Sequence, residues 1–256
     1  MPKRRNITNG VQQVCLSEWQ TVLDFPENSH ELMQLRVANE NCRLAGVLCR
    51  NSSVKIFAEL TDLRNSNLEV EFNLREGAKL EIVCFIGRCM NAKLIQKINL
   101  SGKYSSAVIR NACKTRGEEN VSIRVAQVHT AAQSKSSAIT SVVADGSSNA
   151  SVAGIIDVSQ NSHGSESEQY AKGILLSDSA EITMSPNLNI LSSDVACKHG
   201  AASGGLDDGA VLYAQSRGTS PIQTKKILAD GFMFSTFDDL NHHFWATCLM
   251  PLKENT

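Results

Sequence analysis

Two residues with metal-binding side chains, Cys197 and His199, are separated by a single lysine in the last quarter of the chain. Successive side chains of an extended segment point to opposite faces, so a strand here would place Cys197 and His199 together and Lys198 on the other face. A thiolate and an imidazole supply two of the roughly four ligands of a tetrahedral metal site, so the rest would come from another segment, another chain or solvent. The alternative interpretation is a buried structural thiol beside a strand-end histidine, and the spacing alone favours it.

The segment around this pair carries an ordered series of motifs between Pro186 and Phe232. They read PNLNI, DVACKHGAA, LDDGAVLYAQSRG and ILADGF. This series resembles the C-terminal signature of the SufB/SufD family, the scaffold subunits of the SUF iron–sulfur cluster assembly machinery, and it is more similar to the SufD branch. The sequence differs from the family pattern at Lys198, where serine is common, and around Asn149, where an arginine and a phenylalanine are missing.

The resemblance implies a scaffold rather than an enzyme, with a right-handed parallel β-helix as its core. It implies that a SufB-like subunit pairs with the β-helix and that a SufC-like ABC-type ATPase docks on the C-terminal helices. No cofactor would be permanently bound, and a transient iron–sulfur cluster would form between two β-helices, with His199 as a ligand and Cys197 as its neighbour. The residues that this resemblance assigns to partner binding are Leu206, Leu212, Tyr213, Arg217, Gly218, Ile227, Leu228, Gly231 and Phe232.

Two other functions stay open. A β-helix carbohydrate-active enzyme would need clustered carboxylates or basic groups in a groove, for example a paired acid and base. Most acidic residues here fall at alternating outward positions or in turns. A homomeric minimal scaffold would use two copies of this chain in place of the SufB and SufD pair. The sequence contains no P-loop, dinucleotide fingerprint, HExxH or GxSxG motif.

The composition limits the classes of partner and the cellular compartment that are expected. The 256 residues include 25 Lys or Arg and 26 Asp or Glu, so the basic excess of a general nucleic-acid binder is absent. No run approaches the roughly 18 apolar residues of a membrane-spanning helix, so no membrane contact is expected. No secretory signal is recognised, so the eight cysteines are expected to be reduced and the protein to be cytoplasmic, with a plastid or other organelle also compatible.

Strands are expected to position Cys197 and His199, because side chains with a period of two residues dominate the middle of the chain. Leu68, Val70 and Phe72 alternate with Glu69 and Glu71, which is the pattern of a half-buried strand. Closely spaced short strands alone leave a sandwich, a barrel or a solenoid open. The low aromatic content of 5% leans toward a solenoid, and the resemblance selects the β-helix. We therefore expect an all-β fold: a β-helix core over residues 33–203.

The flanking regions are predicted from weaker signals. Residues 1–32 are expected to form an N-terminal arm, with a helix possible over residues 16–23. Residues 204–256 are expected to form a small helical region. Its first helix would run from about residue 207 to Ser216, a second would start at Pro221 and end at Gly231, and a third would follow residue 235. His129, in the segment VHTAA, is interpreted as a turn or strand-surface histidine.

Overall fold

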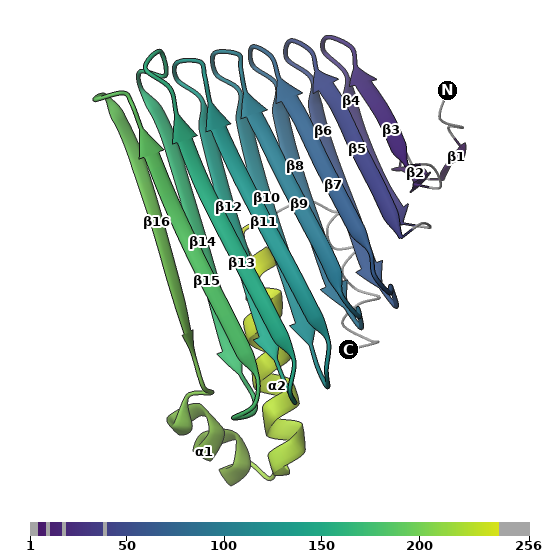
Figure 1. Cartoon of the computed structure of the whole chain (residues 1–256), viewed down its shortest axis with the longest axis vertical. Helices are drawn as coiled ribbons and strands as arrows, with labels where there is room; N and C mark the ends of the chain where they lie inside the picture. Colours follow the sequence, from purple (N-terminus) through teal and green to yellow (C-terminus); the bar gives the residue numbers. More distant parts are fainter. Residues whose placement is uncertain (1–4, 9–10, 17–18, 38–39, 241–256) are drawn as a thin grey trace.

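The computed structural model describes residues 5–8, 11–16, 19–37 and 40–240, and it shows a stack of strands arranged in two facing sheets (Figure 1). Among these residues one sheet has nine strands in the order β1-β2-β4-β6-β8-β10-β12-β14-β16, and the other has seven in the order β15-β13-β11-β9-β7-β5-β3. From β2 onward the chain alternates between the two sheets, which is how a solenoid is wound.

The nine-stranded sheet contains β1 (Arg5–Thr8), β2 (Val11–Leu16), β4 (His30–Val37), β6 (Ser53–Thr61), β8 (Lys79–Gly87), β10 (Ser106–Thr115), β12 (Lys135–Ala144), β14 (Ser165–Leu175) and β16 (Val195–Gly204). The seven-stranded sheet contains β3 (Gln20–Phe25), β5 (Asn41–Leu48), β7 (Asn67–Leu74), β9 (Ala92–Leu100), β11 (Asn120–His129), β13 (Asn149–Val158) and β15 (Glu181–Ile190). Neighbouring strands pair in parallel, except that β1 runs antiparallel to β2. The predicted parallel β-helix is therefore confirmed.

The repeat lengthens along the solenoid, which explains why the sequence shows no fixed period. Register neighbours Lys55 and Glu81 are 26 residues apart, whereas Ser137 and Glu168 are 31 residues apart. The extra residues go into longer strands, which grow from 8 residues in β4 to 11 in β14.

One corner of each coil is made by a residue in the left-handed region of φ. The corner positions of successive coils are Asn28, Asn51, Gly77, Tyr104, Gln133 and Gly164, with φ between 55° and 67°. Glycine and asparagine adopt this conformation at least cost, and they occupy four of these six corners.

The first 32 residues differ from the prediction. Strand β2 pairs in parallel with β4, and β3 pairs with β5, so the stack of parallel strands begins well before residue 33. The helix expected over residues 16–23 is wrong, because β3 has alternating buried and exposed side chains, with Val22 exposed and Leu23 buried. Short apolar runs of this kind fit a helix or a strand equally well until pairing partners are known.

Two helices follow the last strand, α1 (Asp208–Ser216) and α2 (Pro221–Phe234), and the short 3-10 helix η1 (Ser235–Phe237) follows them. Asp207 caps α1, and Ser220 forms a capping box with Gln223 at the start of α2. The predicted end of this helix at Gly231 is wrong. A β-carbon at Gly231 would meet nothing within 4 Å, and the helix continues to Phe234. The predicted third helix falls mostly on residues 241–256, outside the described part.

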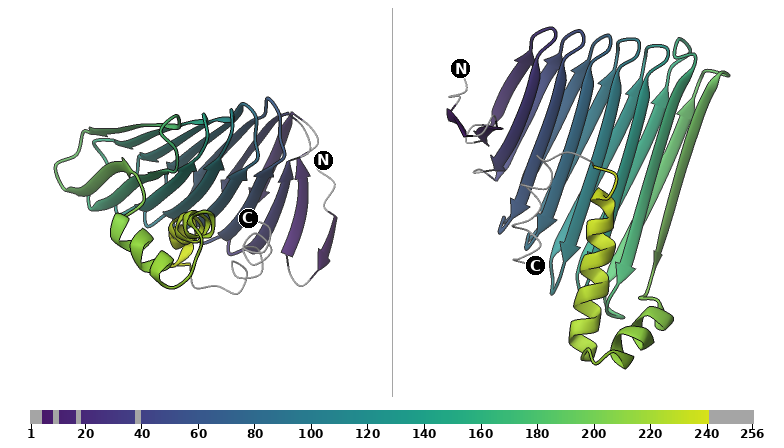
Figure 2. Two further views of the ribbon diagram at one scale, coloured as in Figure 1. Left: turned by 90° about the horizontal axis from the view of Figure 1, so that it is seen from below. Right: turned by 180° about the vertical axis from the view of Figure 1, so that it is seen from behind.

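Helix α2 covers the outer face of the nine-stranded sheet (Figure 2). The cluster formed there consists of Phe57, Val83, Phe85, Ala112, Val143, Ala229, Met233 and Phe237. The Nζ of Lys114 on β10 lies 2.8 Å from the Oδ1 of Asp230 on α2. Burial of apolar side chains thus attaches α2 to the sheet, and the ion pair between Lys114 and Asp230 fixes its position along β10.

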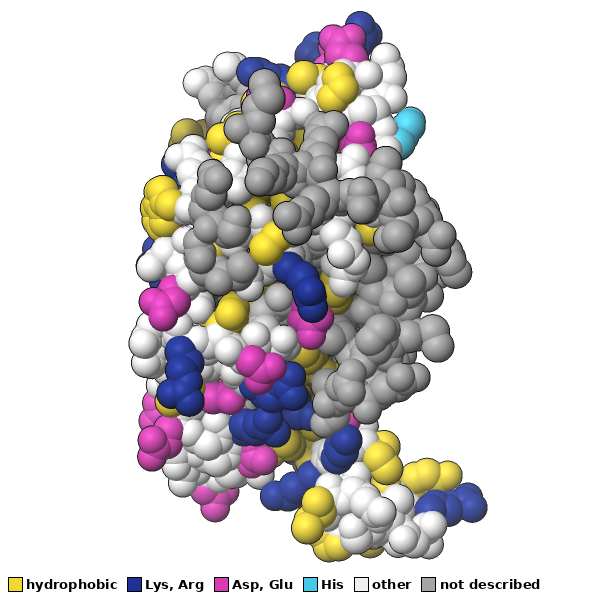
Figure 3. Space-filling model, turned by 90° about the vertical axis from the view of Figure 1, so that its right-hand side faces the viewer, with side chains coloured by type: hydrophobic (Ala, Val, Ile, Leu, Met, Phe, Trp, Pro, Cys, Tyr) yellow, Lys and Arg dark blue, Asp and Glu magenta, His cyan; other side chains and the backbone are white. Residues whose placement is uncertain are grey.

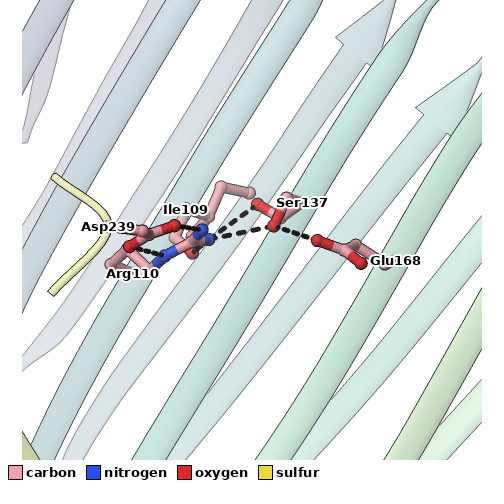
Figure 4. A network of polar contacts seen from close by, with 5 residues as sticks. All are labelled: Ile109, Arg110, Ser137, Glu168 and Asp239. Carbon is pink, nitrogen blue, oxygen red and sulfur yellow. Dashed lines mark hydrogen bonds and ion pairs between the residues drawn. The ribbon is translucent and has the colours of Figure 1, made fainter. Parts of the chain in front are cut away.

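A polar network fixes the segment after η1 on the same face (Figure 4). Arg110 is only 3% exposed, and its guanidinium pairs with the carboxylate of Asp239, with Nε 3.2 Å from Oδ1. Arg110 also donates to Ser137, whose hydroxyl donates to Glu168 at 3.0 Å. A buried guanidinium without such partners would be costly, so this network holds the segment around Asp239 against β10 and β12.

Candidate functional site

The candidate site lies on β16, the last strand of its sheet among the described residues. Strand β15 is the last described strand of the other sheet, so within the described residues this end of the solenoid has two strand edges without a pairing partner. The side chains of both strands are mostly exposed or half-buried, unlike those of the earlier coils. Leu188 and Leu191 are 40% and 65% exposed. The pair predicted from the sequence therefore lies at an open end of the core.

Strand register shows which way Cys197 and His199 face. Cys197 ends the column Val54, Leu80, Ala107, Ser136, Ser167, and His199 ends the column Ile56, Ile82, Ile109, Ala138, Gln169. The preceding members of both columns are buried inside the solenoid. Lys198 follows Ser137 and Glu168 on the outer face. The expected shared face is thus observed, and it is the inner face of the last coil.

The two side chains differ in accessibility. Cys197 is half-buried and His199 is exposed. Burial raises the pKa of the Cys197 thiol, and the Ser167 backbone opposes this only in part. A thiol must lose its proton to bind a metal ion, so this environment disfavours Cys197 as a ligand before a partner arrives. His199 is the better candidate. Among the described residues no three His, Cys, Asp or Glu side chains are grouped to hold a metal ion, so a complete site needs groups from elsewhere.

The interior of the solenoid behind Cys197 and His199 is polar, which the sequence did not predict. His129 is fully buried, so its interpretation as a surface histidine is wrong. Its Nδ1 lies 2.7 Å from the hydroxyl of Ser134, its Nε2 lies 2.8 Å from that of Ser136, and Ser136 lies 2.8 Å from Ser167. Burial lowers the pKa of His129 to about 4, so the ring is neutral at pH 7. This cluster connects the middle of the core with the residue beside Cys197.

A second polar group, Gln169, lies directly next to His199 in strand register. Its Nε2 donates to the carbonyl of Val125 at 3.2 Å, and its Oε1 has no partner among the described residues. A cavity of about 10 Å³ adjoins it, lined also by Thr140, Gly154 and Gly200.

The residues predicted to bind a partner separate into exposed and packed ones. Leu212, Tyr213 and Ile227 are 70%, 63% and 55% exposed. The Cζ of Arg217 lies 5.3 Å from the centre of the Tyr213 ring. Phe232 instead packs against the cluster under α2. The remaining predicted positions are the half-buried Leu206 and Leu228 and the exposed Gly218 and Gly231.

The exposed apolar side chains lie near the junction of α1 and α2, and sequence reasoning missed one of them. Ile222 is 82% exposed. Hydrophobic side chains are visible on the lobe that protrudes at the bottom of Figure 3, where this junction lies. Several large apolar side chains exposed close together are typical of a protein–protein contact. Partner binding by these residues stays a prediction.

A groove of about 330 Å³ on the outer face of the nine-stranded sheet bears on the carbohydrate-enzyme alternative. It is lined by Lys135, Glu166, Glu168 and Lys198, among others. Glu166 is paired with Lys135 at 2.8 Å, and Glu168 accepts a hydrogen bond from Ser137. Both carboxylates are therefore engaged with neighbours, which gives no support to a paired acid and base.

Comparison with known proteins matches most of the β-solenoid and both C-terminal helices to a described family profile. The profile described as "SUF system FeS cluster assembly, SufBD core domain" matches residues 50–232. The chain is 30% identical over 79 residues to the iron–sulfur cluster assembly protein SufD of Escherichia coli, which is 31% of this chain and 19% of that protein. It is 31% identical over 91 residues to the chloroplastic protein ABCI7 of Arabidopsis thaliana, covering 36% of this chain and 19% of that protein. The matched stretches thus span about one fifth of the curated relatives. No helix in the described residues is both long and apolar enough to cross a membrane.

Proposed function

Because the chain belongs to the SufBD core domain family of the SUF iron–sulfur cluster assembly system, we propose that it is a non-catalytic, SufD-like scaffold subunit. It pairs with a SufB-like subunit through the open end of the solenoid. A SufC-like ABC-type ATPase docks on the exposed apolar residues of α1 and α2. The iron–sulfur cluster is transient cargo rather than a resident cofactor.

The observation that carries this proposal is the open end with its inward-facing His199. Within the described residues the outer edges of β15 and β16 have no strand partner, so they offer backbone donors and acceptors that a second β-solenoid can pair with. Pairing would enclose His199 and Cys197 between two chains. An imidazole is a suitable iron ligand, and the partner's side chains would complete a set that this chain leaves incomplete.

The test separates cluster binding from folding. In the complex with both partners, His199→Ala is expected to lower iron–sulfur absorbance while the melting temperature stays near the wild-type value, because His199 is exposed. Cys197→Ala is expected to have a smaller effect. Lys198→Ala is the matched control, since this side chain lies on the opposite face of the same strand. A His199→Ala complex that assembles cluster at the wild-type rate would remove His199 from the site.

The two docking surfaces are tested by a reciprocal pair of variants. Leu212→Asp, on α1, is expected to abolish co-purification with the ATPase and leave pairing with the SufB-like subunit intact. Leu191→Asp, directly after β15, is expected to abolish pairing with the SufB-like subunit and leave co-purification with the ATPase intact. Point variants are preferable to removing the helices, because α2 covers Phe57 and Phe85 and its loss would expose them. If neither variant changes either interaction, the docking surfaces lie elsewhere.

The pairing partner and the compartment are part of the same proposal. Sedimentation of the purified chain distinguishes a heteromeric from a homomeric scaffold, since a stable dimer through β15 and β16 would favour two copies. Six of the described cysteines are free thiols, as expected in a reducing compartment: Cys15, Cys49, Cys84, Cys89, Cys113 and Cys197. We therefore place the protein in the cytoplasm or a plastid.

A further inference from the structure

The carbonyl oxygen of Gln169 is a buried acceptor for which the described residues supply no donor. The side chain is 6% exposed and crosses the interior from β14 to reach the carbonyl of Val125 on β11. That bond uses its Nε2 and leaves Oε1 unpaired. Buried polar atoms are rarely left without a partner, and an ordered water is the usual partner when no protein group is available.

The surrounding residues leave room for a water molecule beside this oxygen. A β-carbon at position 154 would lie 2.1 Å from Oε1, so only glycine fits opposite Gln169. The cavity that Gln169 lines has a volume of about 10 Å³, close to the minimum that holds one water molecule. Thr140 lines the same cavity, and its hydroxyl accepts from Asn111 at 3.3 Å, which leaves its own proton to donate.

The cavity lies beside Gly200, the residue that follows His199. Gln169 and His199 are register neighbours on adjacent strands, about 4.8 Å apart in the hydrogen-bonding direction, and Gly200 lines the cavity. Both side chains lie on the inner face of neighbouring strands, so the imidazole can turn toward a water bound to Oε1. Histidines that bind metals commonly donate their second ring N–H to a carbonyl or a water, which fixes the tautomer and the ring orientation.

We propose that this cavity is a water site and that Gln169 is a positioning residue for His199. The water donates a hydrogen bond to Gln169 Oε1 and accepts one from an N–H of the His199 ring, so that the other ring nitrogen stays free to face a partner. The use of that free nitrogen for iron rests on the proposed function. The water and the tautomer preference do not rest on it.

The tautomer is measured on the full-length chain with ¹⁵N-labelled histidine, from the ring nitrogen chemical shifts at a pH where the ring is neutral. The wild-type protein is expected to show one dominant His199 tautomer. Gln169→Met, which keeps the length but removes the acceptor, is expected to lose that preference. Gln169→Glu, which keeps an acceptor, is expected to retain it. An unchanged tautomer ratio in Gln169→Met would refute the positioning role.

A crystal structure of the wild-type chain provides the second test and does not depend on any variant folding. Electron density for a water within hydrogen-bond distance of Gln169 Oε1 is expected. An empty cavity, or a direct bond between His199 and Gln169, would overturn the water site. Failure of the proposed scaffold function appears separately, as a wild-type chain that binds neither the ATPase nor a SufB-like subunit.

Discussion

Replacing the buried His129 should change how the stability of this protein depends on pH. The ordinary pKa of histidine is 6.5, and burial lowers it to about 4 in the folded protein. The unfolded chain therefore binds the proton more tightly, and stability falls as the pH drops from 6.5 toward 4. The full shift corresponds to about 3 kcal/mol, of which about 2 kcal/mol is lost between about pH 7.5 and pH 5. Among the described residues both ring nitrogens have hydroxyl partners, Ser134 and Ser136, and neither contact offsets this loss as a carboxylate would.

The assay is urea unfolding of the wild-type protein and of His129→Gln at several pH values. The variant keeps a donor and an acceptor but does not titrate. Its free energy of unfolding is therefore expected to change less with pH than that of the wild type over the same pH range. The quantity compared is the difference between the two pH dependences, because carboxylates that titrate in both proteins then cancel. His163→Gln, at an exposed turn position, is the control. Equal slopes for wild type and His129→Gln would refute the assignment of His129 as a buried neutral histidine.

Two further predictions concern packing. Gly154→Ala is expected to cost about 1–3 kcal/mol, because the new methyl group displaces Gln169. The cost should shrink by at least about 0.5 kcal/mol in a Gln169→Ala background, and strictly additive unfolding energies would contradict the packing described. Met233→Ala, which empties a fully buried position under α2, is expected to cost about 2–5 kcal/mol. Ile227→Ala, on the exposed side of the same helix, should leave the melting temperature nearly unchanged.

The strands could be predicted from the sequence because alternation is a local property. Leu68, Val70 and Phe72 are buried as their spacing indicates. Cys197 and His199 share a face for the same reason. The burial of His129 could not be predicted, because it depends on Ser134 and Ser136 across the next corner, and polar side chains inside a core look like surface residues in a sequence.

Partners distant in the sequence also explain the errors at both ends of the chain. The strand character of residues 20–25 follows from pairing with β5, which no local signal shows. Gly231 resembles a helix stop, but packing of the following Met233 on the sheet extends the helix past it. Tertiary contacts overrode local propensity in both cases.

The lengthening of the coils makes the solenoid a tapered stack, and the taper has a consequence for folding. Parallel strands of equal length and similar sequence can slip by a whole coil without exposing much surface. Here β4 has 8 residues and β14 has 11, so a late coil placed on the early part of the stack would overhang its neighbour by residues that have no pairing partner. Adjacent coils are not distinguished in this way, since β6 and β8 both have 9 residues. Strand length therefore separates the two ends of the stack, and the longer strands lie near the open end.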